Sequence, residues 1–475
     1  MTETASTTGS WRALLGGRYL GTSVVLAGGV ALYATNEFLT GSLLPNTVAE
    51  IGGSRLYAWV TTLYLVGSVV AATLVSTVLI RVGPRASYLL GLAVFAAASL
   101  VCGMAPNMGI LIAGRALQGV AGGLLAGLGY AVINTALPRA LWTRAAALVS
   151  AMWGVATVVG PATGGLFAQF GLWRWAFVAM AILTALVAVL VPIALAPKDS
   201  ARLEAVGAAP KVPVGSLLLL GATALAVSVA QLPRNFAATV ALLVATAALI
   251  GLFLIVDRRM RAKVLPPSVF GPGPLKWLYL TMAVMMVGAM VTTYVPLFGQ
   301  RLAHLTPLTA GFLGAALAFG WTVSEIVSAS RDNPRTVARA ITVAPVIMAA
   351  GLALGAATQR DNAPTTTVAL WALALLVAGV GIGLAWPHLS VLAMDSVDDP
   401  ADPSAGGVAA AAINIVQVIS GAFGAGVAGV IVNSVDSAGA ADAAAARWLY
   451  AAFAVLAALG VFASYRACFP ARAER

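Results

Sequence analysis

The sequence predicts an all-α membrane protein with fourteen transmembrane helices, on three observations. First, 60% of the 475 residues are hydrophobic and only 9% are charged, and a soluble fold of this length cannot cover its surface with so few charges. Second, apolar runs of about 20 residues, the length that crosses a bilayer, recur along the whole chain. Third, the Lys and Arg residues behind the net charge of +11 lie in short runs between the apolar stretches, which is typical of membrane topology. A nucleic-acid-binding protein gathers them on one solvated face, so we expect no nucleic-acid partner.

Charge, proline or asparagine bounds each apolar run. The fourteen predicted helices cover residues 22–44, 57–80, 86–104, 109–136, 146–171, 174–196, 214–232, 237–256, 277–299, 308–329, 337–357, 367–394, 407–433 and 448–466. The pair 214–232 and 237–256 is joined only by Pro233, Arg234 and Asn235. If this pair crosses the membrane, it is a hairpin insertion with Arg234 outside; if it does not, twelve crossings remain.

The distribution of basic residues predicts which side of the membrane each loop occupies. With an even number of helices and the N-terminus inside, 20 of the 27 Lys and Arg residues lie in inner loops, six in outer loops and Arg115 within the membrane. This bias predicts a multi-pass protein of the inner (plasma) membrane with both termini cytoplasmic. Residues 1–11 contain one acid and no basic residue, unlike a signal peptide, so we expect the first helix to be retained.

Without the hairpin, the predicted helices divide into six and six, the arrangement of two pseudo-symmetric transporter halves. We therefore expect an N-terminal six-helix bundle in residues 1–199, a linker with a two-helix insertion in 200–266, and a C-terminal six-helix bundle in 267–475. Cys102 and Cys468 fall near opposite membrane faces, which predicts two free thiols, and no metal-binding spacing occurs. The sequence contains no Gly-x-x-x-x-Gly-Lys-Ser/Thr nucleotide-binding loop, so we expect no cofactor and an energy supply from an ion gradient.

Three motifs between residues 110 and 177 carry a family resemblance. Residues 160–165 read Gly-Pro-Ala-Thr-Gly-Gly, residues 173–177 read Trp-Arg-Trp-Ala-Phe, and residues 115–122 read Arg-Ala-Leu-Gln-Gly-Val-Ala-Gly. These motifs resemble those of the major facilitator superfamily, and most closely the fourteen-helix drug:proton antiporters. The resemblance implies a major-facilitator-type fold and a conformational motif formed by Gly160, Pro161, Gly164 and Gly165. Pro161 removes a backbone donor and the glycines permit close helix contacts, so the motif is also consistent with plain helix packing.

Two positions depart from the family pattern. The loop after the second helix normally carries an aspartate where this chain has Ile80, so the charge latch attributed to that aspartate is absent or altered. On the first helix, the usual aspartate falls at Asn36 when Leu44-Pro45 is aligned, and Glu37 stands next to it. Glu37 is therefore the candidate to replace that acid.

Glu37, Arg115 and Glu325 lie well inside predicted helices, where an unpaired charge costs several kcal/mol. Glu37 and Arg115 each lie eight residues from the outer end of their helix, about 12 Å deep, so their side chains are at the right depth to pair. An acid beside an arginine stays ionised until the arginine moves away, after which desolvation favours the protonated form. We interpret the three charges as proton-coupling residues. The alternatives are a permanent structural ion pair for Glu37 with Arg115, and an interfacial salt bridge for Glu325.

Residues that could line a substrate cavity are harder to identify, because a polar or aromatic side chain on a spanning helix often contacts another helix or lipid. The candidates combine hydrogen-bonding groups with adaptable apolar or aromatic surface. They are Asn36, Gln118, Met152, Trp153, His388, Asn414 and Gln417.

The functional prediction is a proton-coupled secondary active exporter, an antiporter of amphipathic or apolar small molecules such as drugs, that works by alternating access and is not an enzyme. Its expected partners are a small-molecule or lipid-like substrate, protons and the lipid bilayer, and we expect a monomer. Because a fold alone does not fix the cargo, two alternatives remain: a carrier of a specific metabolite or lipid, and a non-transporting membrane sensor.

Overall fold

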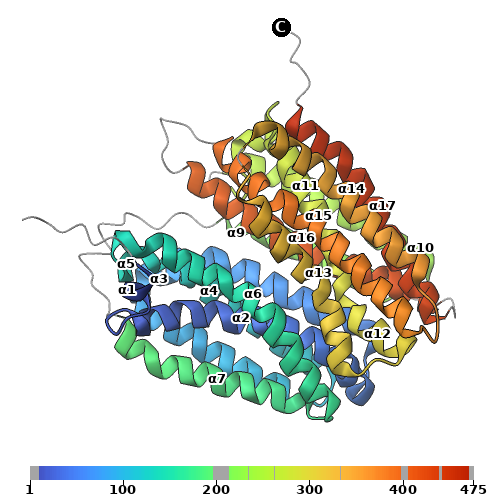
Figure 1. The fold of residues 1–475 in the computed structure, drawn as a ribbon, viewed down its shortest axis with the longest axis horizontal. Coiled ribbons are helices and arrows are strands. Elements are labelled where there is room, and N and C mark those ends of the chain that lie inside the picture. The colour runs from blue at the N-terminus through green and yellow to red at the C-terminus, as the bar shows by residue number, and fades with distance from the viewer. Residues whose placement is uncertain are drawn as a thin grey trace, which may run out of the picture.

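The computed structural model describes residues 10–195, 213–233, 235–260, 263–331, 333–396, 405–437 and 441–469. Every regular element in these ranges is a helix. Residues 196–212, which include the start of the predicted linker, and Arg234 lie outside the described residues. Figure 1 shows two groups of long helices, one from the N-terminal part of the chain and one from the C-terminal part, that lie against each other near α12 and α13.

The N-terminal group contains five long helices and four short ones. In chain order they are α1 (Trp11–Leu14), α2 (Leu20–Ile51), η1 (Ser54–Leu56), α3 (Tyr57–Gly103), α4 (Met108–Ala131), α5 (Ile133–Ala136), η2 (Arg139–Leu141), α6 (Trp142–Gln169) and α7 (Trp173–Ala194). Within this group α3 packs along α4 and α7, and α2 packs on α4, α6 and α7.

The remaining elements form a helical pair and the C-terminal group. The pair is α9 (Val214–Val229) and α10 (Phe236–Arg259). The C-terminal group contains η3 (Pro267–Phe270), α11 (Leu275–Ala289), η4 (Met290–Thr293), α12 (Val295–Ala303), α13 (Pro307–Ser328), α14 (Pro334–Thr358), α15 (Thr365–Asp395), α16 (Ala405–Ser437) and α17 (Asp442–Cys468). Here α15 packs on α13 and α14, while α17 packs on α14 and α11.

Twelve helical segments of the described residues are long and apolar enough to cross a membrane. The prediction of a multi-pass helical protein is therefore confirmed. Helix α2 is not among the twelve, although it has 32 residues, because Asn36, Glu37 and Asn46 lower its hydropathy. Helix α9 is also outside the set, since it has only 16 residues.

The boundaries of three elements differ from the predicted ones. Helix α2 continues past Pro45 to Ile51, where the sequence predicts its end, because a proline inside a helix removes one hydrogen bond without always ending the helix. Helices predicted as 57–80 and 86–104 run on as α3, with a break in helical geometry at Gly83, whose φ is 81°. The segment predicted as one helix over 277–299 is interrupted by the 3₁₀ turn η4 before α12 begins.

The N- and C-terminal groups meet along two seams, α6 with α13 and α3 with α16. Contacts are tightest at the end of the molecule where α2 ends. A Cβ atom on Gly165 of α6 would lie 2.5 Å from Leu308 Cα of α13, and the Asn433 Nδ2 of α16 donates to the Arg55 carbonyl at 2.9 Å. Further along the first seam, a Cβ atom on Gly154 would come no closer than 4.0 Å to Thr322. The seam between α6 and α13 is therefore looser toward its other end.

Candidate functional site

The side chain of Arg115, on α4, lies at the centre of a polar cluster in the N-terminal group. It is only 1% exposed. Its Nη1 donates to Asn36 Oδ1 of α2 and to Gln118 Oε1, the latter at 2.9 Å, and its Nε donates to the Val60 carbonyl at 3.4 Å. The guanidinium carbon lies 3.9 Å from the ring centroid of Tyr64. Neutral acceptors and an aromatic face thus surround this charge.

Gln118 extends the cluster onto α3. Its Nε2 donates to Ser99 Oγ at 2.8 Å, and its Oε1 lies 3.5 Å from the Cys102 thiol. Arg115 and Gln118 share one face of α4 because they are three residues apart. Of the predicted cavity residues, Asn36 and Gln118 are fully buried beside Arg115. They therefore belong to this buried network in the conformation observed.

Glycines on α4 bring the neighbouring helices close enough to form the cluster. A Cβ atom on Gly119 would lie 2.0 Å from the Tyr64 carbonyl oxygen of α3, and one on Gly122 would lie 2.5 Å from the ring of Tyr33 on α2. Such distances leave no room for a side chain. The Arg-x-x-Gln-Gly-x-x-Gly pattern therefore combines two polar groups with the two close approaches that surround them.

Glu37 does not form the direct ion pair with Arg115 that equal depth in the membrane suggested. In the parts of the chain that the structure describes, the salt bridges are Glu50 with Arg174 and Arg301 with Asp442. Successive residues of a helix point about 100° apart, so α2 turns Asn36 toward Arg115 and directs Glu37 away from it. Glu37 is partly buried and still lies within electrostatic reach of the Arg115 charge.

Aromatic residues connect the cluster to α6. Tyr33 and Tyr64 stack with their ring centroids 5.4 Å apart, and the Tyr64 hydroxyl donates to the Tyr33 carbonyl at 2.7 Å. The Trp153 ring meets Tyr33 edge-on at 5.6 Å, while its side chain remains 36% exposed. Sequence reasoning identified Trp153 but missed Tyr33, Tyr64 and Ser99, because tyrosines and serines in an apolar run give no signal of their own.

The other predicted residues lie apart from this cluster. Glu325, on α13, is partly buried and forms a hydrogen bond with the side chain of Trp321 one turn earlier. The Trp321 ring packs on the Trp386 ring, with their centroids 5.2 Å apart. His388 is buried on α15, with its Nε2 3.0 Å from the Ser328 hydroxyl. The second acid therefore lies in the C-terminal group, next to the aromatic surface of Trp321 and Trp386.

Three further candidates occupy less distinctive positions. Met152 is partly buried and packs against the hydrophobic core. On α16, Asn414 is exposed and Gln417 is partly buried. The structure therefore brings neither of the α16 residues into the Arg115 cluster.

The Gly-Pro-Ala-Thr-Gly-Gly motif lies where α6 contacts two other helices. Cβ atoms on Gly160 and Gly164 would lie 2.5 Å from Phe38 Cβ and 2.4 Å from the Leu39 carbonyl oxygen, both on α2. Gly165 faces α13 instead, and the carbonyl oxygen of Pro161 lies close to Gly311 of that helix. The motif thus packs α6 both against α2 of its own group and, across the seam, against α13.

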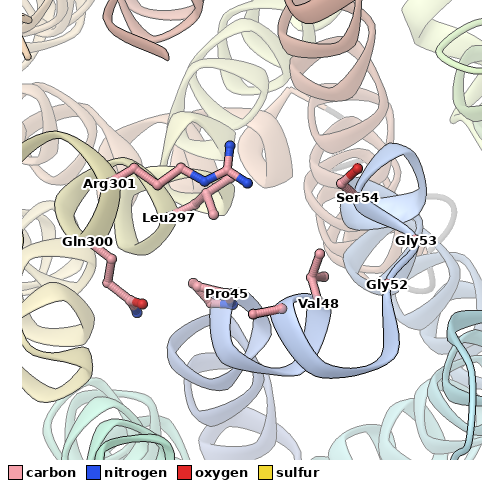
Figure 2. A pocket seen from close by; sticks show the side chains of 9 residues that line it. Pro45, Val48, Gly52, Gly53, Ser54, Leu297, Gln300 and Arg301 are labelled. Carbon is pink, nitrogen blue, oxygen red and sulfur yellow. The ribbon is translucent and has the colours of Figure 1, made fainter.

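A cavity of about 360 Å³ lies between the end of α2 and α12, at the tight end of the seam. Figure 2 shows the Arg301 side chain extending from α12 across this cavity toward Ser54. The lining residues are Pro45, Val48, Ala49, Gly52, Gly53, Ser54, Leu297, Gln300 and Arg301. None of them belongs to the Arg115 cluster, so the cavity is a separate feature between the two groups.

Comparison with known proteins places the chain among membrane transporters. Residues 26–425 match the model of the Major Facilitator Superfamily. The chain is 68% identical over 469 residues, 98% of each chain, to a Mycobacterium tuberculosis protein named probable multidrug-efflux transporter. It is 25% identical over 370 residues to the Multidrug transporter protein MdtP of Bacillus subtilis, which covers 76% of this chain and 66% of that protein.

Solved structures share the fold at low sequence identity. A bacterial homolog of the human lysosomal transporter Spinster, in an inward-facing and unoccupied conformation, matches with a TM-score of 0.63 and 13% identity over 95% of this chain and 97% of that one. A D-xylose–proton symporter matches with a TM-score of 0.64 and 15% identity over 94% and 98%. The family match over most of the chain, the full-length relative and the shared fold lead to one conclusion: the chain belongs to the Major Facilitator Superfamily of membrane transporters.

Proposed function

We propose that the protein is a proton-coupled exporter of amphipathic or apolar small molecules, which acts as a monomer by alternating access. The relative with 68% identity over 98% of each chain, named as a multidrug-efflux transporter, supports efflux as the direction of transport. The buried cluster around Arg115 supports proton coupling, because charged groups inside a membrane span are costly and mark ion or proton pathways.

The proposed coupling step uses Glu37 and Arg115. In the observed conformation, Glu37 lies near the Arg115 charge without a direct salt bridge to it. When substrate binding or a conformational change moves α4 relative to α2 and takes Arg115 away from Glu37, Glu37 takes up a proton. Return of Arg115 to Asn36 and Gln118 releases the proton. Glu325 beside Trp321 is a second candidate acid.

The proposed topology has fourteen crossings, which adds α2 and α9 to the twelve helices with clear transmembrane character. Both termini are then cytoplasmic, and the tight end of the seams faces outward. The domains are the N-terminal bundle in 1–199, the linker and insertion in 200–266, and the C-terminal bundle in 267–475. The observed conformation, closed at Gly165 and Leu308, is accordingly closed to the outside.

Flux in proteoliposomes tests the proposed function. Purified protein is reconstituted with a fluorescent amphipathic compound, and uphill transport is measured with an imposed pH gradient and after an uncoupler has collapsed the pH and voltage gradients. We expect transport only with the gradient. Uphill transport that survives the uncoupler would exclude proton coupling, and the absence of any flux of apolar compounds would favour a specific metabolite or lipid carrier, or a sensor.

Thiol labelling tests the topology. Arg234→Cys, in protein whose Cys102 and Cys468 are replaced by alanine, should react with a membrane-impermeant reagent added to intact cells. Labelling only after permeabilisation would return the topology to twelve crossings.

A further inference from the structure

We propose that the α9–α10 hairpin is a clamp that holds the outer ends of the two six-helix bundles together along the α3–α16 seam. This inference rests on the alternating-access mechanism proposed above. It assigns a mechanical role to the insertion, whose α9 packs on both α3 and α16 as well as on α10. A helix in contact with both bundles at their closed end must release one of them, or move with both, when that end opens.

On the side of the N-terminal bundle, two side chains donate hydrogen bonds to the end of α9 and to the turn that follows it. The Trp59 Nε1 donates to the Ser228 carbonyl at 2.9 Å, and the Arg55 Nη1 donates to the Leu232 carbonyl at 3.0 Å. The last four carbonyls of a helix have no partner within the helix, and α9 ends at Val229. Trp59 of α3 therefore satisfies one of the acceptors that α9 leaves open.

On the side of the C-terminal bundle, α9 fits against small residues of α16. Cβ atoms on Gly426 and Gly429 would lie 2.5 Å from Val227 Cγ1 and 2.1 Å from Gln231 Oε1. The Asn433 Nδ2 donates to the Gln231 carbonyl at 3.3 Å as well as to the Arg55 carbonyl at 2.9 Å. Backbone groups of the hairpin and of the N-terminal bundle thus share one donor from α16.

The junction also contains groups that favour its opening. The Gln231 side chain is 2% exposed, and among the described residues neither its Nε2 nor its Oε1 has a hydrogen-bond partner, and the Ser228 hydroxyl lacks one too. Buried polar groups without partners destabilise the state that buries them. Separation of α9 from α16 admits water to Gln231. The cost of burying this amide therefore partly offsets the stability that the hydrogen bonds give to the closed junction, and the clamp can release.

Within the described ranges, α9 does not lie over the other seam. There α6 and α13 contact each other directly through Gly165 and Leu308, and the principal contacts of α9 are with α3, α10 and α16. The hairpin therefore strengthens one seam selectively. Changes in the hydrogen bonds of the hairpin should shift the balance between outward-closed and outward-open protein while the Arg115 cluster stays unchanged.

Pulsed EPR distances between the two bundles test the clamp without any substrate. Spin labels are placed at two exposed outer positions, Leu172→Cys between α6 and α7 and Asp361→Cys between α14 and α15, with Cys102 and Cys468 replaced by alanine. Trp59→Phe removes the donor to Ser228 and should raise the ratio of open to closed protein about fivefold, the effect of one net hydrogen bond. Gln231→Leu removes the unpartnered amide and should lower the ratio by a similar factor.

The opposite signs separate a clamp from general destabilisation. Trp371→Phe is the matched control, because the Trp371 Nε1 donates to the Thr358 carbonyl at 3.3 Å within the C-terminal bundle, and it should leave the ratio unchanged. A wild-type distance distribution in folded Trp59→Phe, or the same shift in Trp371→Phe, would overturn the proposal. If the distances shift as expected while no variant exports any compound, the clamp stands and the proposed function fails.

Discussion

Arg115 of α4 donates a hydrogen bond to Asn36 of α2, the residue directly before Glu37. The buried cation is thus held by a neutral amide, and the neighbouring acid lies close without pairing. In a family in which an aspartate usually stands where this chain has Asn36, this arrangement separates two roles. We propose that Asn36 fixes the position of the arginine and that Glu37 exchanges the proton.

The first prediction concerns the positioning role. Asn36→Val removes an acceptor from a buried guanidinium, and a hydrogen bond to a charged group contributes about 2 kcal/mol. We expect a clear loss of thermal stability and of folded yield, measured by melting in detergent. Asn46→Val is the control on the same helix, because the Asn46 Nδ2 makes only a long bond of 3.4 Å to the Ala168 carbonyl. Equal stability of the two variants would contradict a positioning role for Asn36.

The second prediction separates packing within a bundle from packing across the seam. Gly164→Ala would place a Cβ atom 2.4 Å from the Leu39 carbonyl oxygen, and such overpacking costs about 1–3 kcal/mol. It should lower the melting temperature. Gly165→Ala, whose Cβ atom meets Leu308 of the other bundle, should instead favour the outward-open conformation with a smaller loss of stability.

Gly154→Ala serves as the control for both glycines, because its nearest neighbour is 4.0 Å away. It should behave like the wild-type protein in melting and in the EPR distances. If Gly165→Ala and Gly164→Ala lower stability equally and neither changes the distances, the motif has no special role at the seam.

The multi-pass helical architecture was predictable because hydrophobic length is a collective signal, whereas the fourteen crossings and the orientation from the basic-residue bias stay predictions. The positions of single side chains were harder to predict. Arg115 and Gln118 were identified because charge and amide groups are rare in an apolar run, but the choice between Asn36 and Glu37 depends on the rotation of α2, which equal depth in the membrane does not determine. Tyr33 and Tyr64 enter the cluster through glycine-mediated helix contacts, and a sequence shows the glycines without showing which neighbour they admit.

The third prediction is a pH dependence at the outer end of α2, beyond the predicted span. The Trp173 Nε1 donates to Glu50 Oε2 at 2.6 Å and Arg174 pairs with the other oxygen, and these bonds lower the pKa of Glu50 from its ordinary value of 4.5. A lowered folded-state pKa gives stability that is present above about pH 4.5 and is lost as the pH falls through the folded pKa. Glu50→Gln should therefore flatten the acid limb of a plot of melting temperature against pH.

A control for this effect is Asp361→Asn, which removes one negative charge from a different outer loop. It should retain the wild-type acid limb. Because the Glu50 and Arg174 side chains are 50% and 37% exposed, the expected change is small. An acid limb of unchanged steepness in Glu50→Gln would show that other groups set it.

The last prediction moves the acid by one position. Glu37→Gln keeps the size of the side chain but cannot carry a proton, so gradient-driven export should be lost while downhill exchange of substrate survives. Asn36→Asp is nearly isosteric, and it replaces the Nδ2 atom, which is buried with no partner in the described part of the chain, with an oxygen that can bind Arg115. The double variant Asn36→Asp with Glu37→Gln therefore carries one acid in direct contact with the arginine. If an ionisable group beside Arg115 is what coupling requires, the double variant should recover gradient-driven export in proteoliposomes. Full coupled activity in Glu37→Gln alone would show that the proton is carried elsewhere, with Glu325 as the next acid to replace. A double variant that folds but is inactive would show that the geometry of Glu37 itself, and not only its charge, is required.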